Sequence, residues 1–388
     1  MLQPIASSQP SYFKDSFEFK NIISQLTLPP GARLFTCDAK SMYTNIPTEP
    51  AIKHISTYLH SIHGKPFLHY QPSTLIDAIK IVFRNNIIQF GDTYWRQIAG
   101  TGMGISPAPP WATIFYALHE NTFLPLWSQH VTFYKRFIDD VFGIWLPHQS
   151  PEQDAIQWLT FQHTMQQWHG LQWEFTPLST TCNFMDLTVT ITKSGRLSTT
   201  LYEKPQNLYL YIPPHSAHPS GMLSGLIHGN ILRIHRLCSS PNDIRQKSSE
   251  LFTRLTYRGY TTQQLTPLFI SAHQKASTHN TTTKPQKTSN PDNKLFLHLQ
   301  FHPEDPKPPA IHKLWDALVL NPPGLQPLHQ VRNHHGHHVT INNLTIAYSR
   351  PLNLRNKFSI CNIVGRGKDV SSYLVDYRAS NPLFISTH

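Results

Sequence analysis

The sequence predicts an α+β fold, in which an antiparallel sheet carries helices on one face and a helical region follows it. Two observations lead to this prediction. Between residues 33 and 203, strand-forming runs and amphipathic stretches follow one another in the order β-α-α-β-β-α-β-β-α-β, which is typical of α+β domains. From about residue 205 the chain becomes basic and helical. Hydrophobic residues make up 39% of the 388 residues, which is enough for a sizeable core.

The α+β part begins with a strand at residues 33–37, which follows a Leu-Pro-Pro-Gly turn signal. The start Thr48-Glu49-Pro50 predicts a helix to about residue 62. The further expected elements are a helix at 73–85, a hairpin of strands 87–90 and 94–98, a helix at 107–127, strands at 134–138 and 141–145, a helix at 151–168, and strands near 171–176, 184–191 and 197–203.

The chain divides into five predicted segments. They are a short N-terminal segment (1–32), the α+β domain (33–204), a helical region (205–275), a polar linker (276–294) and a small mixed segment (295–388). Within the helical region, helices are expected at 222–237, 242–258 and 262–275. The histidine cluster at 334–338 is able to bind a metal, but a surface loop is favoured because no cysteine or carboxylate completes a site there.

The charge of the chain points to an anionic partner. The net charge is +11 and the isoelectric point is near 9.4, which favours nucleic acid over a membrane surface. No apolar run reaches 18 residues and the first residues lack the layout of a signal peptide, so we expect no membrane span and an intracellular location, in the nucleus or the cytoplasm. The four cysteines lack paired spacing, which argues against a zinc ribbon or a disulfide framework.

Two adjacent carboxylates, Asp139 and Asp140, separate two runs of aromatic and β-branched residues. The flanking runs predict a hairpin with the acidic pair as its tight turn. An ordinary acidic turn on a sheet edge is one interpretation. The other is a metal site, because a cation relieves the repulsion between neighbouring carboxylates. Asp38 ends the first strand, where a cap or turn role is the alternative. If the strands are adjacent, two Mg²⁺ ions held by these acids would activate a 3′-hydroxyl and stabilise a leaving pyrophosphate.

Three segments, in this order, resemble motifs A, B and C of reverse transcriptases. They are DAKSMYTNIP at 38–47, GTGMGISPAPP at 100–110 and YKRFIDD at 134–140, and their wording is most similar to the Penelope-like retroelement group. NFMDL at 183–187 resembles that group's strand after the catalytic hairpin, and LYEKP at 201–205 with SAHP at 216–219 resembles its primer grip and thumb entry. The resemblance covers roughly residues 12–275, and weakly 345–354.

The resemblance implies a polymerase palm at 33–204, a thumb at 205–275 and RNA-directed DNA polymerase activity. It implies that Asp38, Asp139 and Asp140 bind two Mg²⁺ ions, with Mn²⁺ as a substitute, and that Asp140 is the least essential ligand. The backbone amides of 39–43 would hold the triphosphate, and Tyr43 would be a steric gate against a ribose 2′-hydroxyl; a core aromatic is the alternative for Tyr43. The implied substrate-binding residues are Ala39, Lys40, Ser41, Met42, Tyr43, Gly104, Ser106 and Pro107.

The glycine-rich GTGMG segment also invites a dinucleotide-binding interpretation, but its G-x-G-x-G spacing and the lack of a preceding βαβ unit argue against it.

Basic residues interleave with tyrosines between residues 193 and 260. This pattern favours binding along a nucleic-acid backbone together with base stacking, and a solvated helix face is the alternative. The implied partners are an RNA template, a DNA primer and deoxynucleotides, and the oligomeric state is left open. The expected nucleic-acid-binding residues are Lys204, Arg233, Arg236, Arg254 and Arg258.

The sequence departs from the family at both ends. Only 37 residues precede Asp38, where reverse transcriptases usually have fingers, so residues 1–32 are interpreted as a remnant of that subdomain. No GIY-YIG endonuclease is found before His388. A truncated or inactive retroelement remnant that only binds nucleic acid is therefore the alternative function. An RNA-templated RNA polymerase is a third hypothesis, which Tyr43 opposes because a steric gate selects deoxynucleotides.

Overall fold

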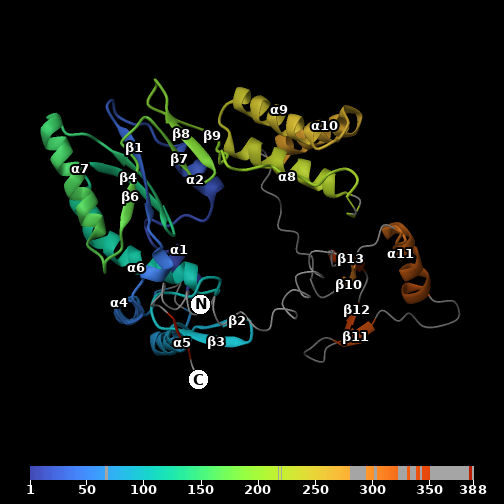
Figure 1. The fold of residues 1–388 in the computed structure, drawn as a ribbon, viewed down its shortest axis with the longest axis horizontal. Helices are drawn as coiled ribbons and strands as arrows, with labels where there is room; N and C mark the ends of the chain where they lie inside the picture. The colour runs from blue at the N-terminus through green and yellow to red at the C-terminus, as the bar shows by residue number, and fades with distance from the viewer. Residues whose placement is uncertain are drawn as a thin grey trace, which may run out of the picture. The chain divides into compact units, whose positions relative to one another are not determined.

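The computed structural model describes residues 1–65, 69–216, 218–219, 221–279, 294–300, 304–321, 330–332, 338–340, 343–349 and 384–386. The chain forms two compact units (Figure 1). The first comprises residues 1–207, 236–245 and 371–388, and the second comprises 208–235 and 246–370. The fold is mixed α and β, and the sheets of the first unit are antiparallel.

A four-stranded sheet lies at the centre of the first unit. Its order is β4 (Val131–Phe137), β5 (Asp140–Trp145), β1 (Arg33–Ala39) and β6 (Trp173–Phe175). The predicted hairpin is confirmed, but the prediction that both aspartates form its turn is wrong. Phe137 pairs with Asp140, so the turn consists of Ile138 and Asp139, and Asp140 is the first residue of β5.

Two helices, α6 (Ala108–Phe123) and α7 (Pro151–Gln166), pack against one face of this sheet (Figure 1). Two more, α4 (Thr48–Ser61) and α5 (Pro72–Arg84), join the same core beside α6, and α6 continues into a short 3₁₀ helix at Leu124–Trp127. α6 is apolar on nearly all sides and almost completely buried, as expected for a central helix. From the sheet, Phe35 and Trp145 point to this face, where their rings contact Trp158 of α7.

A second sheet and the second helix of the N-terminal segment cover the other face of the central sheet, whereas the first helix of that segment packs against α6. The second sheet has the order β7 (Thr181–Phe184), β8 (Leu187–Ile191) and β9 (Leu197–Leu201). The N-terminal segment holds α1 (Gln3–Ser7) and α2 (Ser16–Ile23), and Asp15 caps α2 by accepting from the amides of its first turn. Phe19 of α2 contacts Phe142 of the central sheet and Phe184 of β7, so the segment is part of the core.

Two further strands, β2 (Ile87–Phe90) and β3 (Thr93–Gln97), form the second predicted hairpin, and β3 also pairs with β14 (Phe384–Ser386). A short helix, α3 (Met42–Asn45), follows β1 directly and was not predicted. It begins after Ser41, which has a positive φ of 48°. The chain therefore bends sharply at the end of β1 and runs along the edge of the sheet.

Three helices follow the β-rich part, and their predicted ranges are confirmed to within a few residues. They are α8 (Met222–Leu237), α9 (Pro241–Tyr257) and α10 (Thr262–His279). α10 extends through residues 276–279, which we predicted to be linker. In the second unit, Phe252 of α9 packs edge-on against Phe269 of α10.

The remaining described elements belong to the C-terminal mixed segment. β10 (Lys294–Gln300) pairs in parallel with β13 (Asn343–Ser349), β11 (Gln330–Arg332) pairs with β12 (His338–Thr340), and α11 (Pro308–Trp315) runs into a π-helical turn at Asp316–Leu320. Most of the histidine cluster, residues 334–337, lies outside the described residues, as do 350–354 of the weakly similar C-terminal stretch.

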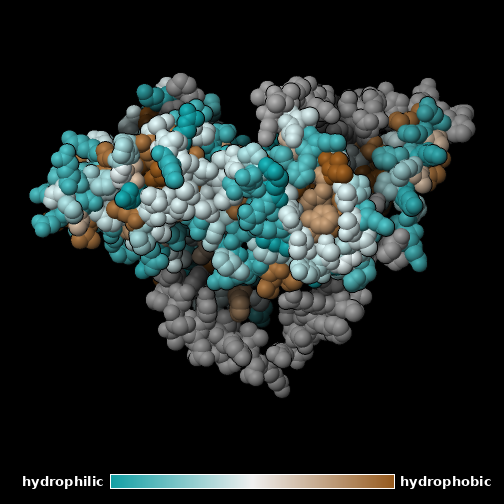
Figure 2. All heavy atoms as spheres, turned by 90° about the horizontal axis from the view of Figure 1, so that it is seen from above, coloured by the Kyte–Doolittle hydropathy of each residue, from teal (hydrophilic) through white to brown (hydrophobic). Residues whose placement is uncertain are grey.

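On the face drawn in Figure 2, hydrophobic residues occur in small groups among hydrophilic and neutral ones. Within the part of the chain that the structure describes, no helix combines the length and the apolar character needed to cross a membrane.

Candidate functional site

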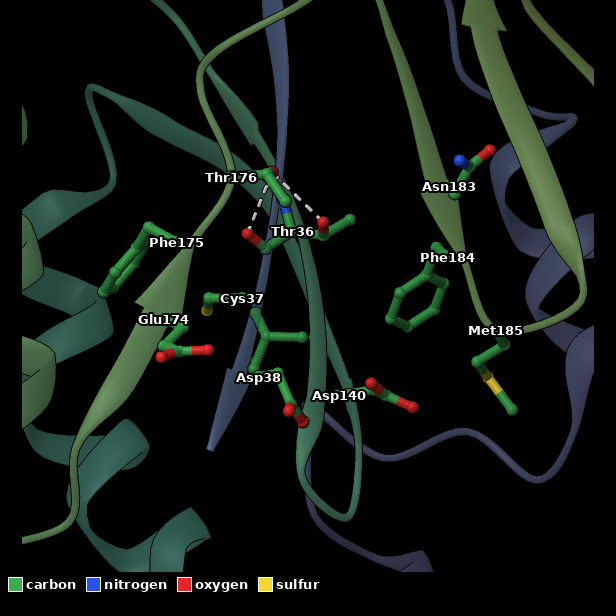
Figure 3. A pocket seen from close by; sticks show the side chains of 11 residues that line it. Thr36, Cys37, Asp38, Asp140, Glu174, Phe175, Thr176, Asn183, Phe184 and Met185 are labelled. Atoms are coloured by element: carbon green, nitrogen blue, oxygen red, sulfur yellow. Dashed lines mark hydrogen bonds between the residues drawn. The ribbon is translucent and has the colours of Figure 1, made fainter. Parts of the chain in front are cut away.

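The central sheet brings three carboxylates into one row. Asp38 on β1 lies opposite Asp140 on β5 and opposite Glu174 on β6. Residues directly opposite each other on neighbouring strands share a face of the sheet, so the three side chains are neighbours. Figure 3 shows Asp38 between Glu174 and Asp140. We name Asp38, Asp140 and Glu174 the acid row.

Sequence analysis did not identify Glu174. Its strand was predicted near 171–176, but only the antiparallel register of β6 on β1 places this glutamate beside Asp38. Glu174 forms an ion pair with Lys40, with 2.7 Å between Nζ and Oε1. Both side chains are more than half exposed, so solvent weakens this pair.

Asp139, in the hairpin turn, lies next to the acid row. The Asp139 carbonyl oxygen accepts a hydrogen bond of 3.0 Å from the Ala39 amide at the end of β1. The preceding residue, Ile138, has a φ of +57°, a left-handed conformation that is unfavourable for a β-branched residue. The turn therefore keeps a conformation that its own sequence does not favour, and contacts from outside must hold it.

The positive charges near Asp38 and Asp140 compensate their burial and mutual repulsion only in part. Burial raises the pKa of Asp140 to about 6, with further contributions from the negative charges of Asp139 and Asp38. Burial also raises the pKa of Asp38, and the charges of Asp139 and Glu174 add to this shift. Lys204 lowers both pKa values, but it does not offset the other contributions. A divalent cation would relieve the repulsion.

The residues present suit Mg²⁺ in chemistry and charge. Carboxylate oxygens are the ligands that Mg²⁺ prefers in proteins, and Mn²⁺ accepts the same donors. Burial and then the neighbouring negative charges raise the pKa of both Asp38 and Asp140, and such a cation would neutralise those charges. Among the residues that the structure describes, no three acidic, histidine or cysteine side chains already converge closely enough to hold an ion. The acid row therefore fits the metal by its donors and needs side-chain movement to enclose it.

A cavity of about 320 Å³ opens beside the acid row (Figure 3). The acid row lines one side, and Asn183, Phe184 and Met185 line the other. Deeper in the cavity, the backbone amide and the side chain of Thr36 are hydrogen-bonded to the Thr176 hydroxyl, which fixes the wall formed by β1. The cavity combines anionic groups at one side with apolar side chains at the other.

The segment after β1 lies close to the acids. Tyr43 is half-buried, and its pKa is raised by burial and by the charge of Asp139, which places the phenol near the turn. The Tyr43 carbonyl accepts a hydrogen bond of 2.6 Å from the Thr101 amide, and the Thr48 hydroxyl donates to the carbonyl of Gly100. The structure therefore joins two of the three segments that resemble polymerase motifs.

Two of the five amides that we expected to hold a triphosphate are engaged within the protein. The Ala39 amide donates to Asp139, and the Lys40 amide donates to the carbonyl of Gln172 at 2.9 Å. In this conformation both amides are occupied by the pairing of β1 with its neighbours, and their binding of a triphosphate stays a prediction. The other three residues of the predicted set are Ser41, Met42 and Tyr43, of which Met42 is buried.

The loop before α6 is open. Gly104 and Ser106 are exposed and Pro107 is half-buried as the residue before the helix. Gly104 has a φ of +87°, and a Cβ built there would meet no atom within 4 Å. The backbone of the loop is thus exposed at Gly104, and no described contact connects these three residues to the acid row.

The predicted nucleic-acid-binding residues have varied surroundings. Lys204 is exposed and acts on the acid row through its charge. Arg236 lies over the ring of Phe17, 5.1 Å from its centroid, and Arg233 is half-buried on the same helix.

Two of these arginines contact other parts of the second unit. Arg254 lies 3.6 Å from the centroid of the Tyr209 ring and is within ion-pair distance of Glu250. The Nε of Arg258 donates to the Tyr211 carbonyl at 2.6 Å. These arginines hold the segment around 209–211 against α9, a structural role that sequence analysis did not foresee.

Comparisons with known proteins add the following similarities. A family model described as an animal helix-turn-helix domain matches residues 210–268, and no curated protein matches the chain. The chain is similar to telomerase from Candida albicans in complex with a TWJ fragment of telomeric RNA, with a TM-score of 0.46, 9% identity, and coverage of 71% of this chain and 52% of that one.

Apo telomerase from Candida tropicalis is similar with a TM-score of 0.41 and 10% identity, and the match covers 71% of this chain and 53% of that one. The RNA-dependent RNA polymerase of BmCPV at elongation state is similar with a TM-score of 0.41 and 11% identity, and the match covers 64% of this chain and 22% of that one. The chain spans about half the length of the telomerase chains that it matches.

Proposed function

We propose that the chain is the palm-and-thumb core of an RNA-directed DNA polymerase from a retroelement of the Penelope-like group. It would transfer a nucleotide from a deoxynucleoside triphosphate to the 3′-hydroxyl of a primer on an RNA template. The observation that carries the proposal is the register of Asp38 with Asp140 on adjacent strands, next to the turn that holds Asp139. The ordered motifs of the sequence agree with it.

Three carboxylates would bind two Mg²⁺ ions in this proposal: Asp38, Asp139 and Asp140. When bound, the ions would acidify the primer hydroxyl and neutralise the leaving pyrophosphate. The protein would contribute mainly by positioning, since phosphoryl transfer needs few other side chains. Tyr43, near Asp139, would pack under the sugar of the incoming nucleotide and leave no room for a 2′-hydroxyl.

Nucleic acid would be held by Lys204 and by the basic helices that follow. Lys204, close enough to lower the pKa of Asp38 and Asp140, would also screen the acids from the phosphates of the primer end. The exposed loop containing Gly104 and Ser106 would support the template base opposite the incoming nucleotide.

Primer extension tests the proposal. The full chain, its Asp139→Asn variant and its Asp77→Asn variant are each incubated with an RNA template, a DNA primer, deoxynucleotides and Mg²⁺. Asp77 is a matched control, because it is an exposed carboxylate on α5 whose partner is Lys80. We expect extension by the wild type and Asp77→Asn, and a loss of at least about 100-fold in Asp139→Asn, because a group that stabilises the transition state is removed.

A second candidate is a nucleic-acid-binding protein without turnover. The absence of a converged metal cluster among the described residues favours it. If none of the three proteins extends a primer, while all bind an RNA–DNA hybrid with strong salt dependence, the polymerase proposal fails and the binding function stands. Incorporation of ribonucleotides as fast as deoxynucleotides by the wild type would instead indicate an RNA polymerase.

A further inference from the structure

A buried ion pair lies directly behind the hairpin turn. It joins Arg136, the second-last residue of β4, to Glu120 of α6. Both side chains are at most 1% exposed. Nε of Arg136 donates to Oε1 of Glu120 at 2.6 Å, and Nη2 donates to Oε2 at 2.9 Å. The pair is therefore bidentate, the geometry that best compensates the cost of burying two charges.

The remaining donors of Arg136 contact backbone carbonyls. Nη2 also donates to the carbonyl of Thr113 on α6 at 2.9 Å, and Nη1 donates to the carbonyl of Ile138 at 2.8 Å. Ile138 is the first residue of the turn and has the left-handed conformation. One guanidinium thus connects a central helix to the strained residue that precedes Asp139.

Glu120 in turn is held by two hydroxyl groups. Ser11 donates to Oε2 at 2.5 Å and Tyr134 donates to Oε1 at 2.8 Å. Each carboxylate oxygen therefore accepts two hydrogen bonds. The carboxylate cannot rotate without breaking several of them, so it fixes the direction of the Arg136 guanidinium.

The turn is held from its two ends. Arg136 binds the carbonyl of Ile138, and the Ala39 amide binds the carbonyl of Asp139. We propose that Arg136, oriented by Glu120, is a positioning residue that fixes the backbone of the turn and thereby holds the Asp139 carboxylate where it would bind cations together with Asp38 and Asp140. This inference rests on the proposed function for its catalytic consequence, but the positioning itself is measurable without activity.

Lysine at position 136 is the discriminating substitution. Lys keeps the positive charge next to Glu120, but its single ammonium cannot reach Glu120, Thr113 and Ile138 together as the planar guanidinium does. Tyr134→Phe is the matched control, because it removes one hydrogen bond to the same carboxylate and leaves the contact between Arg136 and Ile138 in place.

Hydrogen exchange of the Ala39 amide reports the position of the turn, since this amide donates to Asp139. We expect Arg136→Lys to accelerate this exchange at least tenfold and to raise the Mn²⁺ concentration for half-saturation about tenfold, with kcat for extension reduced and KM for the deoxynucleotide little changed. Tyr134→Phe should change the exchange rate less than threefold. Unchanged exchange and Mn²⁺ binding in a folded Arg136→Lys protein would overturn the inference.

Two further outcomes separate the inference from the proposed function. If the wild type extends no primer but Arg136→Lys still accelerates the exchange, the positioning role stands and the polymerase function fails. If Arg136→Lys does not fold, the double variant Glu120→Leu with Arg136→Met replaces the pair without leaving either charge unpaired. In that variant too, exchange at Ala39 as slow as in the wild type would refute the role of Arg136.

Discussion

Gly143 lies in the middle of β5, directly opposite Phe35 of β1, and its lack of a side chain makes room for that ring. A Cβ built on Gly143 would lie 2.8 Å from Cε2 of Phe35 and closer still to Cζ and Cε1, whereas ordinary contacts begin at 3.4 Å. Phe35 is fully buried, and its ring is enclosed by Trp158 and Phe161 of α7, at 5.1 and 5.7 Å between centroids. The ring therefore has no space into which it can withdraw.

We expect Gly143→Ala to lower the free energy of unfolding by about 3 kcal/mol, at the upper end of the cost of overpacking a core. This corresponds to a change of roughly 100-fold in the unfolding equilibrium and a melting temperature lower by about 6–12 °C. Urea and thermal unfolding followed by tryptophan fluorescence measure it, because Trp145 and Trp158 belong to the same aromatic cluster. Shortening the opposing side chain in Gly143→Ala with Phe35→Leu should recover about 1–2 kcal/mol through coupling of the two sites.

The same substitution in a helix is the control. A Cβ at Gly229 of α8 meets no atom within 4 Å, so Gly229→Ala should raise stability by about 0.5–1 kcal/mol through helix propensity. A Gly143→Ala protein within about 0.5 kcal/mol of the wild type would refute the packing argument, since such a change is typical of surface positions. So would a double variant that is as unstable as the sum of the two single ones.

Three other predictions concern separate parts of the chain. Tyr43→Ala should increase ribonucleotide incorporation relative to deoxynucleotides in primer extension, and unchanged selectivity would exclude the steric gate. Thr199→Val removes a buried 2.7 Å hydrogen bond to the carbonyl of Leu237 and should cost about 1–2 kcal/mol in urea unfolding; a cost near zero would show that water replaces the hydroxyl. Nε2 of His235 lies 2.8 Å from Nδ1 of His273, and burial lowers the pKa of both side chains below the usual 6.5. The unfolded chain therefore binds protons at a higher pH than the folded chain does. The free energy of unfolding should consequently fall as the pH drops from 6.5 to 5. Circular dichroism melts across this range test it, and a melting temperature that does not fall would contradict it.

Local patterns were enough to predict the hairpin and the three helices after it. Alternating aromatic and β-branched residues identify β4 and β5, and the amphipathic spacing with Gly259 identifies α9. In the central sheet, the predicted boundary that was wrong is the one that strand pairing sets. The turn begins at Ile138 because β5 pairs with both β4 and β1 in one register, which overrides the preference of a β-branched residue for negative φ.

The sequence was enough to predict the acids of the candidate site that lie at the ends of predicted strands, which are Asp38, Asp139 and Asp140. Glu174 was missed because its position depends on the register of β6, and a register is a tertiary property. The ion pair of Arg136 with Glu120 was missed for another reason. Charged residues are usually exposed, so the sequence gives no signal that these two are buried together.

Several partners of the N-terminal segment are synthesised much later than the segment itself. Phe13 packs against Phe137 and Phe184, and Lys20 donates to the carbonyl of Cys238, 218 residues along the chain. A growing chain therefore exposes these aromatic residues until most of the first unit has left the ribosome. Contacts at such separation slow folding, because long loops must close first. Completion of this part of the core is thus delayed until the second sheet and the residues around Cys238 have been synthesised. Before that point the exposed aromatic residues of the segment favour aggregation or binding by chaperones.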